Sequence, residues 1–258
     1  MEEIFTQVQK YVGDHRLMKE FSVLYPNIQW LRYDEINYEE IQIQNINNIS
    51  ITKLVLQQHY VGLNILVFKN LTHLYCNGSE LTSLPMLPEG LIYLNCSNNL
   101  LNSLPPLSQG LTHLICYNNQ LTSLPPLPQG LTNLECSNNQ LTSLPSLPPG
   151  LEYLECDNNQ LTSLPPLPPG LTHLDCYDNQ ITSLPPLPEG LIYLNCYDNQ
   201  LTSLPPLPKK LTHLYCYNNH NQITSLPPGL THLHCSSNQI SRLSKLPEIE
   251  IVLSLIHI

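Results

Sequence analysis

The sequence of 258 residues contains no alanine and little charge: Asp, Glu, Lys and Arg together make up 12% of it. Its aromatic residues are mainly tyrosine, with 14 Tyr against 3 Phe and 1 Trp. Proline is abundant instead, at 24 residues. Because proline lacks the N–H that a helix interior needs, long surface helices are excluded over most of the chain. The composition favours a repetitive, extended architecture.

Basic residues are scarce. The 10 Lys and Arg face 20 Asp and Glu, which gives a formal net charge of -10. Nucleic acids and anionic membranes both attract basic surfaces. We therefore expect no nucleic-acid partner and no membrane partner, and we expect a protein partner with a basic surface.

Targeting signals are also lacking. No stretch has the roughly 18 consecutive apolar residues that a membrane-spanning helix needs. The first residues, Met1 to Phe5, include two glutamates where a secretion signal would carry basic residues. We expect an intracellular, cytoplasmic protein.

An internal period of 20 residues runs through the chain from Leu71, with the form LTHLxCxxNQLTSLPPLPxG. Upstream, Leu54 and Leu56 fit the same frame, so the expected repeat region is 51–248. All 9 cysteines follow the period, at Cys76, Cys96, Cys116, Cys136, Cys156, Cys176, Cys196 and Cys216, with Cys235 one residue short of it.

One unit, Leu111 to Gly130, defines positions 1 to 20 of a coil. Residues 114–116 alternate between two faces with period 2, which predicts a short strand. The prolines at positions 15, 16 and 18 favour an extended, polyproline-like return segment. Gly130 is expected to permit the turn into the next strand. Stacked coils would place these strands in one parallel sheet.

This pattern, LxxLxCxxNxLxxLPxLPxG, resembles a leucine-rich repeat, and its short LPxLPxG return is similar to the 20-residue class found in bacterial effectors and in large DNA viruses. The resemblance implies a solenoid: an arc with a parallel β-sheet on its concave face and extended convex segments. It also implies a binding scaffold without a cofactor, which in a viral or effector setting would act in the host-cell cytoplasm. Some effectors of this kind carry a separate ubiquitin-ligase domain after the repeats; because only about ten residues of this sequence follow Glu248, we do not carry that activity over.

Two columns of the repeat are expected to be structural. The position-6 cysteines share a face with the core leucines, so we expect free thiols packed as small apolar groups, among them Cys116, Cys136, Cys156 and Cys176. Free thiols imply a reducing compartment. The position-9 asparagines are expected to bond backbone groups at the bend, as in the resembling family. They are Asn99, Asn119, Asn139, Asn159, Asn179, Asn199, Asn219 and Asn238.

Binding is expected at positions 3, 5, 7 and 8, which would line the concave face. Tyrosine and histidine alternate there with acidic residues, which suits a basic, partly apolar partner. The alternative is that exposed strand positions merely tolerate these residue types. The candidates are His113, Tyr117, Glu135, Tyr153, Glu155, Asp157, His173, Asp175, Tyr177, Asp178, Tyr193, Tyr197, Asp198, His213, Tyr215 and Tyr217.

Two other functions stay open. His232 and His234 fall on one strand with His213 beside them, which would allow a metal-binding or pH-responsive site. Alternatively, the chain could be a substrate-recognition subunit that N-terminal helices attach to a ubiquitin-ligase complex. No set of residues resembles a catalytic site, so we expect no enzyme and no cofactor.

The two ends depart from the repeat. Residues 1–50 are expected to form a helical cap, with helices ending at Gly13 and before Pro26, and with a possible degenerate coil at 31–50. Residues 249–258 alternate like a strand. An uncovered strand there would be a candidate edge for self-association.

Overall fold

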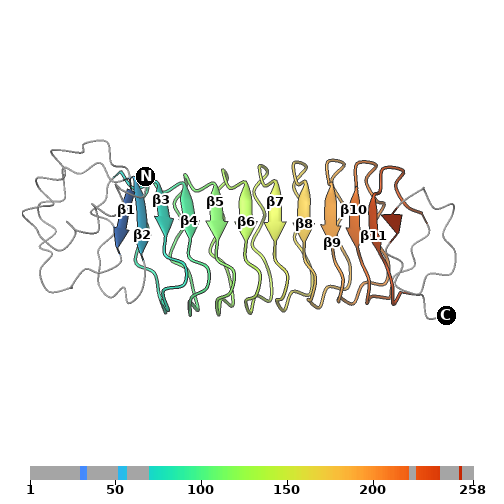
Figure 1. The fold of residues 1–258 in the computed structure, drawn as a ribbon, viewed down its shortest axis with the longest axis horizontal. Helices are drawn as coiled ribbons and strands as arrows, with labels where there is room; N and C mark the ends of the chain where they lie inside the picture. Colours follow the sequence, from blue (N-terminus) through green and yellow to red (C-terminus); the bar gives the residue numbers. More distant parts are fainter. Residues whose placement is uncertain (1–29, 34–51, 57–69, 221–224, 239–249, 252–258) are drawn as a thin grey trace, which may run out of the picture.

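The structure of the protein is a computed structural model that describes residues 30–33, 52–56, 70–220, 225–238 and 250–251. The helices expected before Pro26 lie outside these residues, as does most of the expected C-terminal strand. Within the described part, a single parallel sheet runs in sequence order from β1 to β12 (Figure 1). The expected solenoid of stacked coils is therefore confirmed.

The strands are short, and each coil from β3 onward contributes 3 residues up to β11. The end strands β1 and β12 extend the sheet beyond the regular repeats. The strands are β1 Trp30–Tyr33, β2 Lys53–Leu56, β3 His73–Tyr75, β4 Tyr93–Asn95, β5 His113–Ile115, β6 Asn133–Glu135, β7 Tyr153–Glu155, β8 His173–Asp175, β9 Tyr193–Asn195, β10 His213–Tyr215, β11 His232–His234 and β12 Glu250–Ile251.

Neighbouring strands are in register, so that residues 20 apart in sequence lie side by side. Leu114 pairs with Leu134, for example, and Glu135 pairs with Glu155. The last step is 19, with His213 paired to His232. Each position of the repeat thus becomes a continuous row that runs along the solenoid.

The core lies directly beneath the sheet. Leu111, Leu114, Cys116 and Leu121 are all 0% exposed, and the same four positions are buried in the coils from Leu71 to Cys216. Burying a leucine side chain contributes about 1.5–3 kcal/mol, but one coil has no opposite layer to bury it against. Stability therefore comes from the contact of each coil with its two neighbours.

Two turns close each coil. At the turn that precedes each strand, the N–H of Leu131 donates to the carbonyl of Pro128 over 3.1 Å, which places Gln129 and Gly130 at the centre of the turn. Among the described glycines only Gly78 has a positive φ, at 65°. The turn predicted at Gly130 is present, but it does not depend on glycine's left-handed backbone, which explains why Lys210 occupies the same position before Leu211.

The backbone position that does need a left-handed residue is position 8. Asn118 has a φ of 52° and Asp178 a φ of 49°, and every described coil from Asn98 to Ser237 repeats this conformation. Asn, Asp and Gly tolerate positive φ better than other residues. The Asn, Asp or Gly found at position 8 of most coils is therefore explained by the backbone of the turn.

Candidate functional site

The position-9 asparagines hold the bend after each strand. In Asn159, Nδ2 donates to the carbonyls of Cys136, Cys156 and Asp157 at 3.0–3.1 Å. Its Oδ1 accepts from the N–H of Leu141 at 2.9 Å. The same set of bonds links coils elsewhere along the row, so each amide joins its own coil to the preceding one.

The cysteine side chains point away from the outer surface. All nine are free and buried, and the first eight are 0% exposed. Burial raises the pKa of the Cys96 thiol to about 12, and it raises the thiol pKa of the other cysteines in the same direction. These thiols are protonated at pH 7 and do not contribute reactive groups to the surface.

On the opposite side of the sheet lies the strand face, which we define as the side chains at positions 3, 5 and 7 of the coils from β3 to β11. The sequence has no lysine or arginine at these positions. Most of the side chains are half-buried by their neighbours in the same row. The sequence-predicted binding residues fall here, except Asp178 and Asp198, which occupy the left-handed turn position.

Aromatic rings stack along the position-3 row. Tyr153 and His173 lie 4.2 Å apart between ring centroids with 9° between their planes, and His173 and Tyr193 lie 4.1 Å apart with 8°. The row continues through His213, which stacks on His232 at 4.1 Å. This arrangement forms a nearly continuous aromatic surface.

A second row of rings lies at position 7. Tyr177, Tyr197 and Tyr217 stack at centroid distances of 4.3 and 4.2 Å. Nearer the N-terminal end, the ring of His113 lies 5.7 Å from that of Tyr93. In a later coil, the ring of Tyr215 at position 5 lies 5.7 Å from that of Tyr193. Tyr117 lies half-buried beyond the end of β5. The structure therefore gathers the predicted aromatic residues into two rows, in which Asn133 separates His113 from Tyr153 and Ser137 and Asp157 separate Tyr117 from Tyr177.

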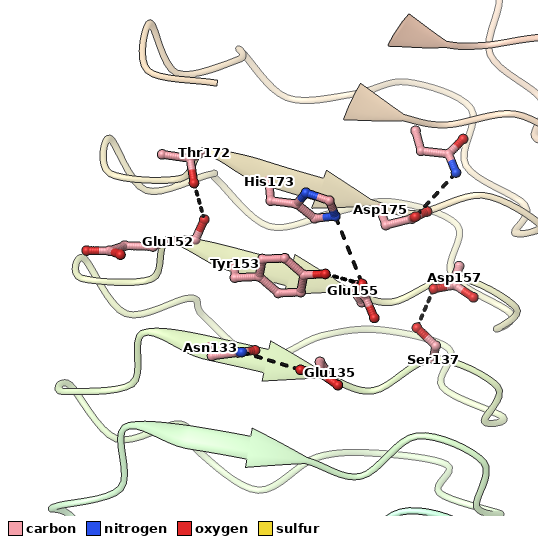
Figure 2. A network of polar contacts seen from close by, with 11 residues as sticks. Asn133, Glu135, Ser137, Glu152, Tyr153, Glu155, Asp157, Thr172, His173 and Asp175 are labelled. Carbon is pink, nitrogen blue, oxygen red and sulfur yellow. Dashed lines mark hydrogen bonds and ion pairs between the residues drawn. The ribbon is translucent and has the colours of Figure 1, made fainter. Parts of the chain in front are cut away.

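Four carboxylates form an acidic patch beside the aromatic rows: Glu135, Glu155, Asp157 and Asp175 (Figure 2). The register places Glu155 directly between Glu135 and Asp175 on adjacent strands. Like charges placed directly opposite in a sheet destabilise it. The patch is thus an arrangement that folding alone does not favour.

The environment of the patch favours protonation. Burial, with Asp157 nearby, raises the pKa of Asp175 to about 7. Burial, and then the neighbouring Glu155, raises the pKa of Glu135. Burial lowers the pKa of His173 to about 4, so its imidazole is neutral at pH 7. The 4.0 Å between His173 Nε2 and Glu155 Oε1 is therefore neither an ion pair nor a hydrogen bond at that pH.

Neutral donors reach each carboxylate. The Tyr153 hydroxyl donates to Glu155, and the Ser137 hydroxyl donates to Asp157, which is only 5% exposed (Figure 2). Asn133 and Asn195 were not among the sequence-predicted residues. Their amides nevertheless donate to Glu135 at 3.3 Å and to Asp175 at 3.2 Å. Their place in the repeat, opposite or beside an acidic residue, is the signal that would have identified them.

The three histidines considered for a metal site do not converge. His213 and His232 are stacked face to face, while His234 stacks on Tyr217 and its Nε2 lies 3.1 Å from Ser236 Oγ. In the part of the chain that the structure describes, no group of three or more His, Cys, Asp or Glu side chains is arranged to hold a metal ion.

Strands β10 and β11 each follow a threonine that contacts the first histidine of the strand. Thr212 Oγ1 lies 3.2 Å from the Ile192 carbonyl and 2.8 Å from His213 Nδ1. The same contacts occur between Thr231 and His232, so the threonine hydroxyl helps to orient the imidazole ring.

A family model for leucine-rich repeats, two copies at a time, matches five overlapping stretches of the sequence: 109–149, 129–169, 149–189, 169–208 and 189–228. No curated protein matches the sequence significantly. Across the described residues, no helix has the length and apolar character needed to cross a membrane.

Solved structures extend the similarity. YopM from Yersinia enterocolitica is 29% identical with a TM-score of 0.68, and the match covers 88% of this chain and 55% of YopM. YopM from Yersinia pestis, a leucine-rich effector protein, is 28% identical with a TM-score of 0.65, over 95% of this chain and 73% of its own. The functional domain of InlJ from Listeria monocytogenes, which includes a cysteine ladder, shares the fold at 24% identity and a TM-score of 0.68. The match covers 90% of this chain and 58% of the InlJ chain.

This chain therefore spans only about half of the Yersinia enterocolitica protein, although it contains the same kind of solenoid. The length of the repeat, the parallel sheet and the family match agree with one another. Residues 109–228 thus match leucine-rich repeats, and the chain folds as a solenoid of 20-residue repeats similar to that of bacterial leucine-rich effector proteins.

Proposed function

We propose that this protein is a non-enzymatic scaffold that binds a protein partner through its strand face. The leucine-rich-repeat fold is consistent with a protein–protein interaction role, since stacked repeats present an extended binding surface. The observation that carries the proposal is the composition of that face: stacked Tyr and His rings beside four carboxylates, without lysine or arginine.

The partner has a basic, partly apolar surface. Tyrosine rings provide large and rigid contact areas, and the acidic patch would attract positive charge and repel nucleic acid and anionic lipid. Burial raises the pKa of Asp175 to about 7, and a cation bound beside it would favour the ionised form of this carboxyl group.

The site of action is a reducing compartment. Nine buried free thiols agree with a cytoplasmic protein, since oxidising compartments promote disulfides. Similarity to a Yersinia pestis effector supports action in the cytoplasm of a host cell.

The test is site-specific photo-crosslinking in a reducing cytosolic lysate. One variant carries a photo-reactive phenylalanine analogue in place of Tyr177 on the strand face, and a second carries it in place of Ser163, which is exposed on the return segment. A partner that binds the strand face will crosslink to the first variant and not to the second.

A charge-reversed variant then tests the acidic patch. Glu135→Lys, Glu155→Lys and Asp175→Lys together should abolish the crosslink. The matched control reverses three exposed glutamates off the strand face, Glu89→Lys, Glu152→Lys and Glu189→Lys, and should retain it. Both triple variants must melt like the unmodified protein. Equal crosslinking of the two triple variants, or a crosslink only from position 163, contradicts the proposal.

A further inference from the structure

The acidic patch lacks a cationic neighbour. Of the described basic side chains, only His173 lies within 4.0 Å of a carboxylate of this patch, and it is neutral at pH 7. An ionised carboxylate has about four lone-pair sites. Glu155 receives one hydroxyl donor from Tyr153, and Asp175 receives an amide donor from Asn195 and a backbone hydrogen bond from Tyr177. Several acceptor sites of these two carboxylates are therefore unused.

Buried oxygens without partners lie in the same place. Among the described residues, three buried side-chain polar atoms have no hydrogen-bond partner: Asn133 Oδ1, Asp175 Oδ1 and Asn195 Oδ1. All three are acceptors, and no donor is left unpaired in this way. They belong to strands β6, β8 and β9, which flank or carry the carboxylates.

Asn195 is the most informative of the three. Its side chain is only 6% exposed, and the bond from its Nδ2 to Asp175 Oδ2 fixes which way round its amide lies. Its Oδ1 therefore adds a negative partial charge beside Asp175 that no donor neutralises. Unpaired buried acceptors are rare in folded proteins because they cost free energy. When Asp175 is ionised, this oxygen is a further unpaired acceptor beside the carboxylates, and it points to a positively charged ligand rich in N–H donors.

The spacing of the carboxylates restricts the shape of that ligand. Glu155 and Asp175 lie opposite each other on adjacent strands, about 4.8 Å apart, so one planar group can reach both carboxylates. The Tyr153, His173 and Tyr193 rings of the position-3 row cover one another's faces and present their edges beside these carboxylates. A guanidinium is planar and has five N–H donors in a fixed fork, whereas an ammonium is a compact point charge.

We propose that the strand face binds an arginine side chain of the partner, with the guanidinium donating to Glu155 and Asp175 beside the ring edges of the Tyr153–His173–Tyr193 stack. This inference rests on the proposed scaffold function and adds to it the chemistry of the anchoring residue. Lysine in the same place would leave more of the acceptor capacity unused, because an ammonium has three donors and no planar fork that bridges two carboxylates.

The test uses three capped glycine–serine peptides that are identical except at three positions, which hold arginine, lysine or the uncharged isostere citrulline. Binding to the full chain is measured by titration calorimetry at two salt concentrations. We expect the arginine peptide to bind at least tenfold more tightly than the lysine and citrulline peptides. Equal affinity for arginine and lysine peptides would overturn the inference, because it would show attraction to charge alone.

Neutral variants locate the binding. Glu155→Gln with Asp175→Asn should weaken the arginine peptide at least tenfold, while Glu89→Gln with Glu189→Gln should change its affinity less than twofold. Similar losses in both variants, or in neither, would place the binding elsewhere and overturn the inference. If the arginine peptide does not bind, but the triple charge-reversed variant still loses the photo-crosslinked partner, the scaffold function stands and the arginine anchor is wrong. If the crosslink is absent as well, the scaffold function itself fails.

Discussion

Asp175 and Asn195 lie opposite each other on adjacent parallel strands, and the Asn195 amide donates to the Asp175 carboxylate over 3.2 Å. They are 20 residues apart in sequence, and only the register of β8 on β9 brings them together. This neutral donor and a backbone hydrogen bond from Tyr177 do not offset the burial of the carboxyl group and the proximity of Asp157, which together raise the pKa of Asp175 to about 7.

Stability should depend on pH through Asp175. The pKa of Asp175 is raised from an ordinary value of 3.8 to about 7, so the folded state binds this proton more tightly than the unfolded state does. The resulting contribution to the free energy of unfolding is fully present below about pH 4 and is lost as the pH rises through 7. Asp175→Asn removes this loss and should raise the free energy of unfolding at pH 8 by up to about 4 kcal/mol relative to the unmodified protein, at 1.36 kcal/mol per pKa unit.

Urea unfolding at pH 5 and pH 8 measures this effect. Asp178→Asn is the matched control, because it makes the same chemical change at an exposed turn position where asparagine is equally suited to the positive φ. If the Asp175 and Asp178 variants show the same pH dependence, the raised pKa of Asp175 does not affect stability.

The position-9 amide should be a large local contributor to stability. Asn159→Ala removes four hydrogen bonds to backbone groups and leaves a partly buried N–H and three carbonyls without that partner. The expected loss is about 1–3 kcal/mol of unfolding free energy. Gln160→Ala, at the exposed neighbouring position, should cost less than about 0.5 kcal/mol. Comparable losses in chemical denaturation would refute the structural role of the asparagine row.

The left-handed turn at position 8 should discriminate sharply between substitutions. Asn138 is exposed and has a φ of 53°. Asn138→Gly should be tolerated, whereas Asn138→Val should destabilise the protein by about 1–2 kcal/mol, because a β-branched side chain clashes with the backbone at positive φ. Thermal unfolding of the two variants is the measurement, and equal melting temperatures would show that the backbone is free to relax.

The thiols should be inert until the chain unfolds. Because burial raises the pKa of Cys96 to about 12 and the first eight cysteines are 0% exposed, iodoacetamide at pH 8 should not alkylate them in the native protein. All nine should react in urea. Ser163→Cys provides an exposed thiol as a positive control. Mass spectrometry that finds native labelling within Cys76 to Cys216 would mean that the coils open readily.

The repeat itself was predictable from sequence because its requirements are local and periodic. Leucine at positions 1, 4 and 11 with cysteine at 6 can be buried only if coils stack, so the spacing of Leu111, Leu114, Cys116 and Leu121 was sufficient to predict the solenoid and the in-register sheet. The prolines excluded a helical return for the same local reason. The helices expected before Pro26 lie outside the described residues and remain a prediction.

The tertiary structure decided how the outward side chains meet. The sequence placed Glu155 and Asp175 on one face, but the bond from Tyr153 to Glu155 and the neutral state of His173 depend on side-chain conformations and on burial by neighbouring rows. It also suggested Asp178 as a binding residue, where the structure shows the left-handed turn that favours an aspartate. Sequence determines rows because the period is fixed at 20, whereas the contacts between rows depend on packing in three dimensions.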